Sequence, residues 1–241
     1  MALVDGETSV DEDGDVSFDA MRLKSKVANS LAEQLSRGSD EDKAEAKRLF
    51  ELSIEIDSRE ETWSAEGLAY SHGGLGRLYY FAEEPDLEKA RHHFAEDLKY
   101  SIKAGSRVGQ TKMNSLMAAC DLKLADRDGG TDHLESALHC YRQARRFSDS
   151  PFDSYFALAG ILECLGRLDR LDEADEFGNE LAELARAAVA ALDDEGRKEN
   201  PVSAIPGFCV PAVESALKRC QKPGSDWHHW LSRLVIENRT D

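Results

Sequence analysis

Residues 73–105 read GGLGRLYYFAEEPDLEKARHHFAEDLKYSIKAG, and this stretch decides the fold class. Apolar side chains recur in it every three or four residues, which predicts two amphipathic helices. The segment EEPD separates the two helices, and Asp86 is a residue type that caps a helix N-terminus. The glycines Gly73, Gly74 and Gly76 would each cost the first helix roughly 1 kcal/mol relative to alanine. Close contact with a neighbouring helix is the expected compensation.

The same helical periodicity extends through most of the chain. Candidate helices occupy residues 18–37, 40–57, 62–83, 86–104, 109–126, 131–147, 151–166, 169–192, 211–220 and 226–237. Residues that favour helix N-termini are Ser39, Asp86, Asp132, Ser150 and Pro151, and glycines that favour helix ends are Gly38, Gly105 and Gly166. No segment alternates apolar and polar residues at strand spacing with Val, Ile or Thr enrichment. The sequence therefore predicts an all-α fold.

Composition divides the chain into four parts. They are an acidic flexible tail at residues 1–19, a helical domain at 20–192, a proline-containing linker at 193–210 and capping helices at 211–241. The first part holds seven acidic residues and no basic one. Such a segment cannot bury enough apolar surface to offset the entropy of ordering it.

The charge balance excludes broad classes of function. The chain has 30 basic and 47 acidic residues, for a formal net charge of −17. Direct nucleic-acid binding through phosphate contacts needs clustered Lys and Arg and is not expected. No apolar run reaches the about 18 residues of a membrane-spanning helix.

The N-terminal sequence and the cysteines indicate a cytoplasmic protein. The N-terminus is acidic and lacks the basic and apolar regions of a secretory signal. The five cysteines are odd in number and form no CxxC pair, so we expect reduced, packed thiols. They are Cys120, Cys140, Cys164, Cys209 and Cys220.

A small residue followed by a large aromatic one recurs on the second helix of successive pairs. The pairs are Ala46 with Phe50, Ala90 with Phe94, Ala137 with Tyr141 and, in a shifted version, Ala174 with Phe177. On the first helices, a large and a small residue lie side by side and another large one follows, in Leu75-Gly76 with Tyr79 and in Leu158-Ala159 with Leu162. These patterns resemble the tetratricopeptide repeat (TPR) family, whose signature contains L-G-x2-Y and A-x3-F. Residues 73–105 match best and are also similar to the related Sel1-like repeat.

The resemblance implies a fold and a binding surface. The fold is an α-solenoid of antiparallel helix hairpins over residues 20–192, with the C-terminal helices as a cap. The concave face of such a solenoid binds an extended or helical segment of another protein. The matching concave-facing positions are Arg77 and Tyr80, then Asn114 and Lys123, then Tyr155 and Glu163. Some family members bind a C-terminal carboxylate through basic and amide side chains. The resemblance implies that Arg77, Asn114 and Lys123 could bind a carboxylate in the same way.

The leading hypothesis is a noncatalytic adaptor or regulatory subunit whose acidic surface favours a basic partner protein. Two other classes stay open. One is an acidic inhibitor that occludes a nucleic-acid-binding protein by imitating phosphate charge. The other is a helical-bundle enzyme with an unrecognised site.

Histidines provide the most specific alternative to protein binding. His92 with Glu96 and His93 with Asp97 lie one helical turn apart, and each pair could offer two metal ligands. The sequence nominates no third ligand for either pair. It also contains no P-loop, Rossmann, nucleophile-elbow or HExxH motif. No catalytic, cofactor-binding or metal-binding residue is therefore assigned, and no cofactor is expected.

Overall fold

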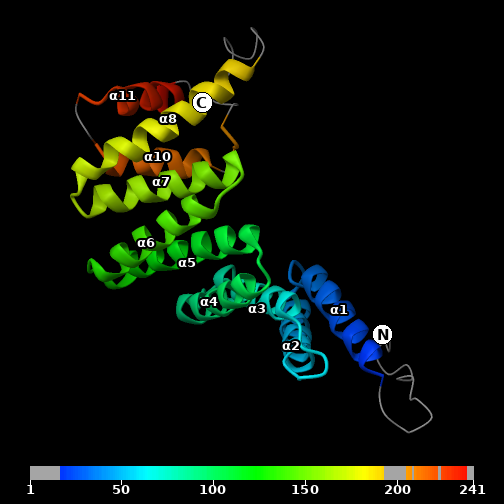
Figure 1. Cartoon of the computed structure of the whole chain (residues 1–241). Helices are drawn as coiled ribbons and strands as arrows, with labels where there is room; N and C mark the ends of the chain where they lie inside the picture. Colours follow the sequence, from blue (N-terminus) through cyan, green and yellow to red (C-terminus); the bar gives the residue numbers. More distant parts are fainter. Residues whose placement is uncertain (1–16, 193–204, 208, 222–223, 238–241) are drawn as a thin grey trace. The chain divides into compact units, whose positions relative to one another are not determined.

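The computed structural model describes residues 17–192, 205–207, 209–221 and 224–237. Regular structure in these ranges is helical throughout, without a strand (Figure 1). The chain forms two compact units, Met1–Gly109 and Gln110–Asp241. The prediction of an all-α fold is confirmed for the described part of the chain.

Unit 1 is built from consecutive helix hairpins. Its helices are α1 (Phe18–Leu35), α2 (Asp40–Asp57), α3 (Ala65–Tyr80) and α4 (Leu87–Lys103), and α5 (Arg107–Asp128) begins at its end. Each of the first three helices packs on the next one in sequence, and α1 also contacts α3 (Figure 1).

Helices α1 and α3 run parallel to each other. The side-chain amide oxygen (Oδ1) of Asn29 accepts a hydrogen bond from the Ser71 hydroxyl at 2.8 Å. Further toward the C-terminal ends of both helices, the Arg77 guanidinium pairs with the Glu33 carboxylate at 2.6 Å. Because the partners advance in the same direction on both helices, equivalent ends of α1 and α3 lie side by side.

Local hydrogen bonds set the helix starts in unit 1. Ser39 and Asp42 form a reciprocal capping box at the start of α2, and the Asp86 carboxylate accepts from the Lys89 backbone N–H at 3.0 Å. Both predicted caps are confirmed. Helix α3 begins later than predicted, because Ser64 caps it by accepting from the Gly67 N–H at 3.0 Å.

The helical glycines make room for aromatic rings. A Cβ atom added at Gly74 would lie 2.5 Å from Cε1 of Phe50, and one added at Gly76 would lie 2.5 Å from Cδ1 of Phe94. Both rings are completely buried. The predicted close contact between helices is therefore confirmed, and it fixes which helix each glycine faces: Gly74 faces α2 and Gly76 faces α4.

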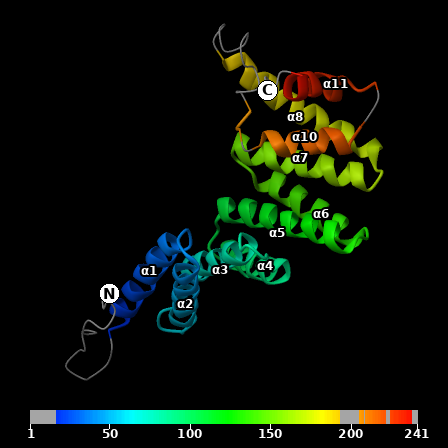
Figure 2. The same cartoon turned by 180° about the vertical axis from the view of Figure 1, so that it is seen from behind.

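Unit 2 continues the pairwise packing. It contains the rest of α5, then α6 (Asp132–Phe147), α7 (Pro151–Arg167), the 3-10 turn η1 (Leu171–Glu173), α8 (Ala174–Ala191), α10 (Val210–Arg219), α11 (Asp226–Ser232) and the π-helical turn η3 (Arg233–Glu237). Helix α7 lies against α6, α8 and α10, and α11 packs on α8 (Figure 2). The C-terminal helices thus cover α7 and α8.

Aromatic rings fill glycine positions in unit 2 as well. A Cβ atom at Gly160 would lie 2.5 Å from Cε2 of Tyr141. Gly178 on α8 faces the ring of Trp227, whose indole N–H donates to Asp175 at 3.0 Å. An aromatic residue of α11 therefore occupies the space beside Gly178.

Several predicted boundaries differ from the structure. Thr131 and not Asp132 stands at the N-cap of α6, and Ser150 makes no side-chain capping bond, although Pro151 is at the first helical position. Helix α7 ends at Arg167, one residue beyond Gly166, and the backbone of Arg219 approaches the chain at Gly166.

The predicted tail and linker fall largely on undescribed residues. Of the tail at 1–19, residues 1–16 lie outside the described ranges, and α1 begins at Phe18. Of the linker at 193–210, residues 193–204 and 208 lie outside them, and α10 begins at Val210.

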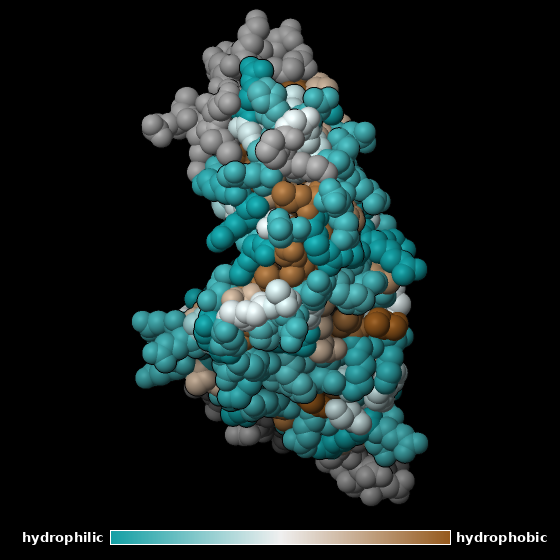
Figure 3. Space-filling model, turned by 90° about the vertical axis from the view of Figure 1, so that its left-hand side faces the viewer, coloured by the Kyte–Doolittle hydropathy of each residue, from teal (hydrophilic) through white to brown (hydrophobic). Residues whose placement is uncertain are grey.

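All five cysteines are buried and free of disulfides, as predicted. No helix within the described ranges combines the length and the apolar character that crossing a membrane requires. Hydrophilic side chains cover most of the face seen in Figure 3, interrupted by small apolar patches.

Candidate functional site

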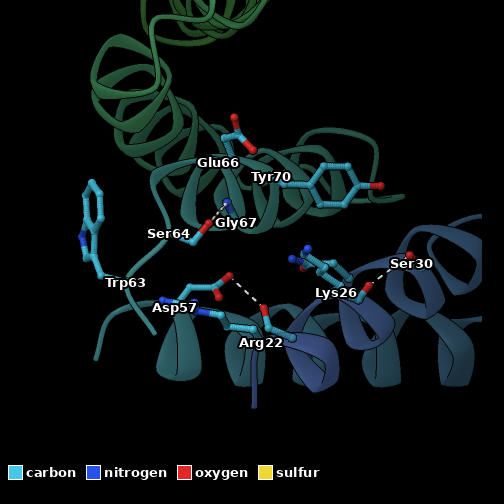
Figure 4. A pocket seen from close by; sticks show the side chains of 11 residues that line it. Arg22, Lys26, Ser30, Asp57, Trp63, Ser64, Glu66, Gly67 and Tyr70 are labelled. Atoms are coloured by element: carbon cyan, nitrogen blue, oxygen red, sulfur yellow. Dashed lines mark hydrogen bonds between the residues drawn. The ribbon is translucent and has the colours of Figure 1, made fainter. Parts of the chain in front are cut away.

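A cavity of unit 1 lies between α1, α3 and the C-terminal end of α2. We call it the α1–α3 cavity, and its volume is about 650 Å³. Its walls combine two cations, two carboxylates and two aromatic rings, namely Arg22, Lys26, Asp57, Glu66, Trp63 and Tyr70 (Figure 4). The hydroxyls of Ser25, Ser30 and Ser64 and the amide of Asn29 complete much of the lining.

Asp57 is the most buried charged residue of this lining. It is the last residue of α2 and is 3% exposed. The Ser25 hydroxyl donates to its Oδ2 at 2.8 Å, and no other described residue donates a hydrogen bond to this carboxylate. Burial raises the pKa of Asp57, while the Ser25 hydrogen bond and the charge of Lys26 oppose that rise.

Gly67 on α3 leaves the space that the Asp57 carboxylate occupies. A Cβ atom added at Gly67 would lie 2.7 Å from Cγ of Asp57 and closer still to its Oδ2. The backbone N–H of Ser64 donates to the Asp57 carbonyl oxygen at 3.1 Å. The turn between α2 and α3 therefore holds the carboxylate against α1.

The aromatic side chains of the cavity are half-exposed. Trp63 is 50% exposed, and Tyr70 is 45% exposed. The Tyr70 ring centroid lies 6.5 Å from that of the core residue Phe50, which anchors one edge of the ring. Burial, followed by the charge of Glu33, raises the pKa of Tyr70.

A second cavity, of about 330 Å³, lies farther along the same two helices. Arg77 lines it and bridges to Glu33 of α1, which Arg37 also approaches at 3.5 Å. Phe81 at its edge is 69% exposed. The predicted residue Arg77 is therefore part of a surface cavity.

Tyr80 and the predicted residues of unit 2 differ in accessibility. Tyr80 is half-buried, and its ring packs edge-on against Phe81. Lys123 is exposed, and Glu163 is half-buried, with its carboxylate 3.8 Å from Arg167.

Asn114 and Tyr155 lie in the core. Asn114 is 5% exposed and its amide donates to the Gln110 carbonyl at 2.8 Å. Tyr155 is 2% exposed, and burial raises the pKa of its hydroxyl to about 12. The resemblance places these two side chains on an exposed face, whereas the structure buries them, so neither presents a surface to a partner. Both positions come from the alignment with the repeat signature, which does not determine which neighbouring side chains cover each face of a helix.

Of the two pairs on α4 that could each offer two metal ligands, His93 and Asp97 point to different neighbours. His93 points to His72 of α3, with 3.1 Å between their Nδ1 atoms, and Asp97 points instead into the core beside Gly73. The Ser101 hydroxyl donates to Asp97 at 2.8 Å. Within the described ranges, no group of three or more His, Cys, Asp or Glu residues is arranged to hold a metal ion.

The histidine pair forms the centre of an aromatic stack. The His93 ring stacks on Tyr79 and the His72 ring on Tyr100, with centroid distances of 5.6 and 5.8 Å. Burial lowers the pKa of His93 to about 4 and also lowers that of His72. Burial raises the pKa of Asp97 to about 6. Both imidazoles are therefore neutral near pH 7 and share one hydrogen bond.

Sequence reasoning missed the α1–α3 cavity. One signal for it was present: Asp57 follows Phe50, Ser53 and Ile56 on the buried face of α2, where a carboxylate is unusual. Comparison with known proteins assigns no family, because no family model matches the chain and no curated protein matches it.

Proposed function

We propose that this protein is a noncatalytic adaptor of TPR-like architecture, and that the groove between α1 and α3 binds a polypeptide segment of a partner protein. The parallel arrangement of these two helices, with a cavity between them, is the observation that carries the proposal. In the TPR-like interpretation, α1 and α3 are the first helices of successive hairpins and line the concave face.

The size and lining of the cavity support binding of a ligand. Its volume of about 650 Å³ falls within the range of roughly 300–1,000 Å³ that is common for ligand pockets. Half-exposed Trp63 and Tyr70 are residue types that frequently act as anchors in protein interfaces. The serine hydroxyls and the Asn29 amide of the lining each make a hydrogen bond within the chain, and each keeps further donor or acceptor capacity that a peptide backbone can use.

The charge of the chain supports a basic partner. A formal net charge of −17 attracts basic surfaces at long range and accelerates their encounter. Salt screens this attraction, so raising the ionic strength to about 0.5 M is expected to slow association. An association rate independent of salt would contradict this part of the proposal.

Photo-crosslinking from inside the groove tests the proposed function. A benzophenone amino acid replaces Tyr70 in one variant and Ile102 in another. Ile102 is 56% exposed on α4 and lines neither cavity, so it is a matched control in the same unit. We expect the Tyr70 position to give discrete crosslinks to segments rich in Lys and Arg, identified by mass spectrometry, and the Ile102 position not to give them. The same products from both positions, or no polypeptide product from Tyr70, would refute the proposal.

A further inference from the structure

The Asp57 carboxylate has unused capacity for hydrogen bonds. A carboxylate can accept several, and a buried one is costly unless it is well hydrogen-bonded. Asp57 is 3% exposed, yet Ser25 supplies its one hydrogen bond from the described residues, to Oδ2. Asp57 also lines a cavity of about 650 Å³. The structure thus leaves both an acceptor and the space for a donor.

The cations already in the cavity do not fill this role. The Arg22 guanidinium donates to the Glu61 carbonyl oxygen at 3.1 Å, which directs it to the turn after α2. Lys26 influences Asp57 through its charge, but it forms no ion pair with Asp57. Both side chains are exposed at the opening, where water screens their charge.

The rest of the lining favours a cation from outside. Glu66 adds a second carboxylate on the α3 side (Figure 4), and because it is exposed, water screens its charge as it screens the charges of Arg22 and Lys26. The half-exposed rings of Trp63 and Tyr70 line the same cavity and can attract a cation through their faces. An anionic ligand would instead bring its charge against the buried Asp57 carboxylate.

We infer that the α1–α3 cavity is a pocket for an arginine side chain of the partner segment, with Asp57 as its buried anionic end. Guanidinium is favoured over ammonium because its planar fork donates to a carboxylate through two parallel hydrogen bonds and stacks on aromatic rings. This inference rests on the proposed function and specifies the residue type that the groove recognises.

A pair of matched peptides tests the inference on the full chain. The probe is acetyl-Gly-Ala-Arg-Ala-Gly-amide, and its control carries citrulline, which is nearly isosteric with arginine but uncharged. Titrations followed by ¹H–¹⁵N NMR give the dissociation constant from the shifts of residues on α1 and α3, including the Trp63 indole N–H. We expect the arginine peptide to bind at least about 10-fold more tightly than the citrulline peptide, as for a charge-assisted hydrogen-bonded pair.

Variants connect the binding to Asp57. Asp57→Asn retains an acceptor for Ser25 but removes the charge, and is expected to weaken the arginine peptide by at least about 10-fold. Asp40→Asn is the matched control, because Asp40 is 94% exposed at the start of α2 and lines neither cavity; it should leave the affinity unchanged. Lys26→Gln should strengthen binding, because it removes a competing positive charge.

Clear outcomes overturn the inference. The inference is wrong if the arginine and citrulline peptides bind with equal affinity, or if wild type and Asp57→Asn bind the arginine peptide with equal affinity. It is also wrong if 10 mM of the arginine peptide, about ten times the 1 mM dissociation constant of a weak ligand, causes no chemical-shift change. The peptide comparison uses the wild-type protein and therefore does not depend on the folding of any variant. If the arginine probe fails while Tyr70 still gives discrete crosslinks, the arginine pocket is wrong and the groove stands; failure of both removes the proposed function as well.

Discussion

Replacing Gly74 with alanine should destabilise unit 1, although alanine is the better helix former. The added Cβ would lie 2.5 Å from Cε1 and 2.6 Å from Cε2 of Phe50, distances that no real Cβ contact tolerates. Phe50 is fully buried beside Leu49 and Leu75, so its ring has no open space to enter. The helix or the ring must therefore shift.

Two opposing free-energy contributions set the magnitude. Overpacking a close-packed core costs about 1–3 kcal/mol, and the upper part of this range, about 2–3 kcal/mol, applies here because Phe50 is completely buried. The higher helix propensity of alanine offsets roughly 1 kcal/mol of this cost. We expect a net loss of about 1–2 kcal/mol in the free energy of unfolding, which lowers the urea midpoint by about 0.5–1 M for a slope near 2 kcal/mol per molar urea.

Urea denaturation of the full chain, followed by circular dichroism at 222 nm, measures this change. Ala44→Gly on the exposed face of α2 is the control for helix propensity alone, with an expected loss of about 1 kcal/mol. Phe50→Leu should relieve the clash, so the double variant with Gly74→Ala should be more stable than the sum of the two single losses. An unchanged or raised urea midpoint for Gly74→Ala would refute the claim that Gly74 makes room for the Phe50 ring. So would a double variant whose loss of stability equals the sum of the two single losses.

Three further outcomes are expected. Burial lowers the pKa of His93 to about 4 from its ordinary 6.5, so the unfolded chain binds more protons than the folded chain between these pH values, and the stability that His93 contributes should be full above pH 6.5 and fall toward pH 4. His93→Phe should therefore flatten the decline of the urea midpoint between pH 7 and pH 4.5. Asp97, whose pKa is raised to about 6, contributes in the opposite direction in both proteins. Ser39→Ala should cost about 1 kcal/mol in the same assay, since it removes the capping box of α2, and no loss would contradict the cap. Gly178→Ala should displace the Trp227 ring and shift its fluorescence emission to longer wavelength, whereas an unchanged spectrum would show that α11 adapts without exposing it.

The sequence by itself determined the helices and most of their boundaries. Helix periodicity, the Ser39 capping box and the Asp86 cap act over three or four residues, so their signals are complete within a short window. The predicted start of α3 was less accurate. The Ser64 hydroxyl accepts a hydrogen bond from the Gly67 N–H, so α3 begins later than its apolar pattern suggests. The three glycines also predicted close contact, since nothing within the helix compensates for their cost.

Only the tertiary structure decided which partners meet. It placed Trp227 beside Gly178, buried Asn114 and Tyr155, and brought Asp57 to a cavity whose walls come from three helices. These outcomes depend on contacts between residues that are distant in sequence. The same type of side chain is found both buried and exposed, and the packing of the neighbouring helices decides which of the two occurs. Periodicity records which face of a helix is covered, but the identity of the covering residue is set by packing alone.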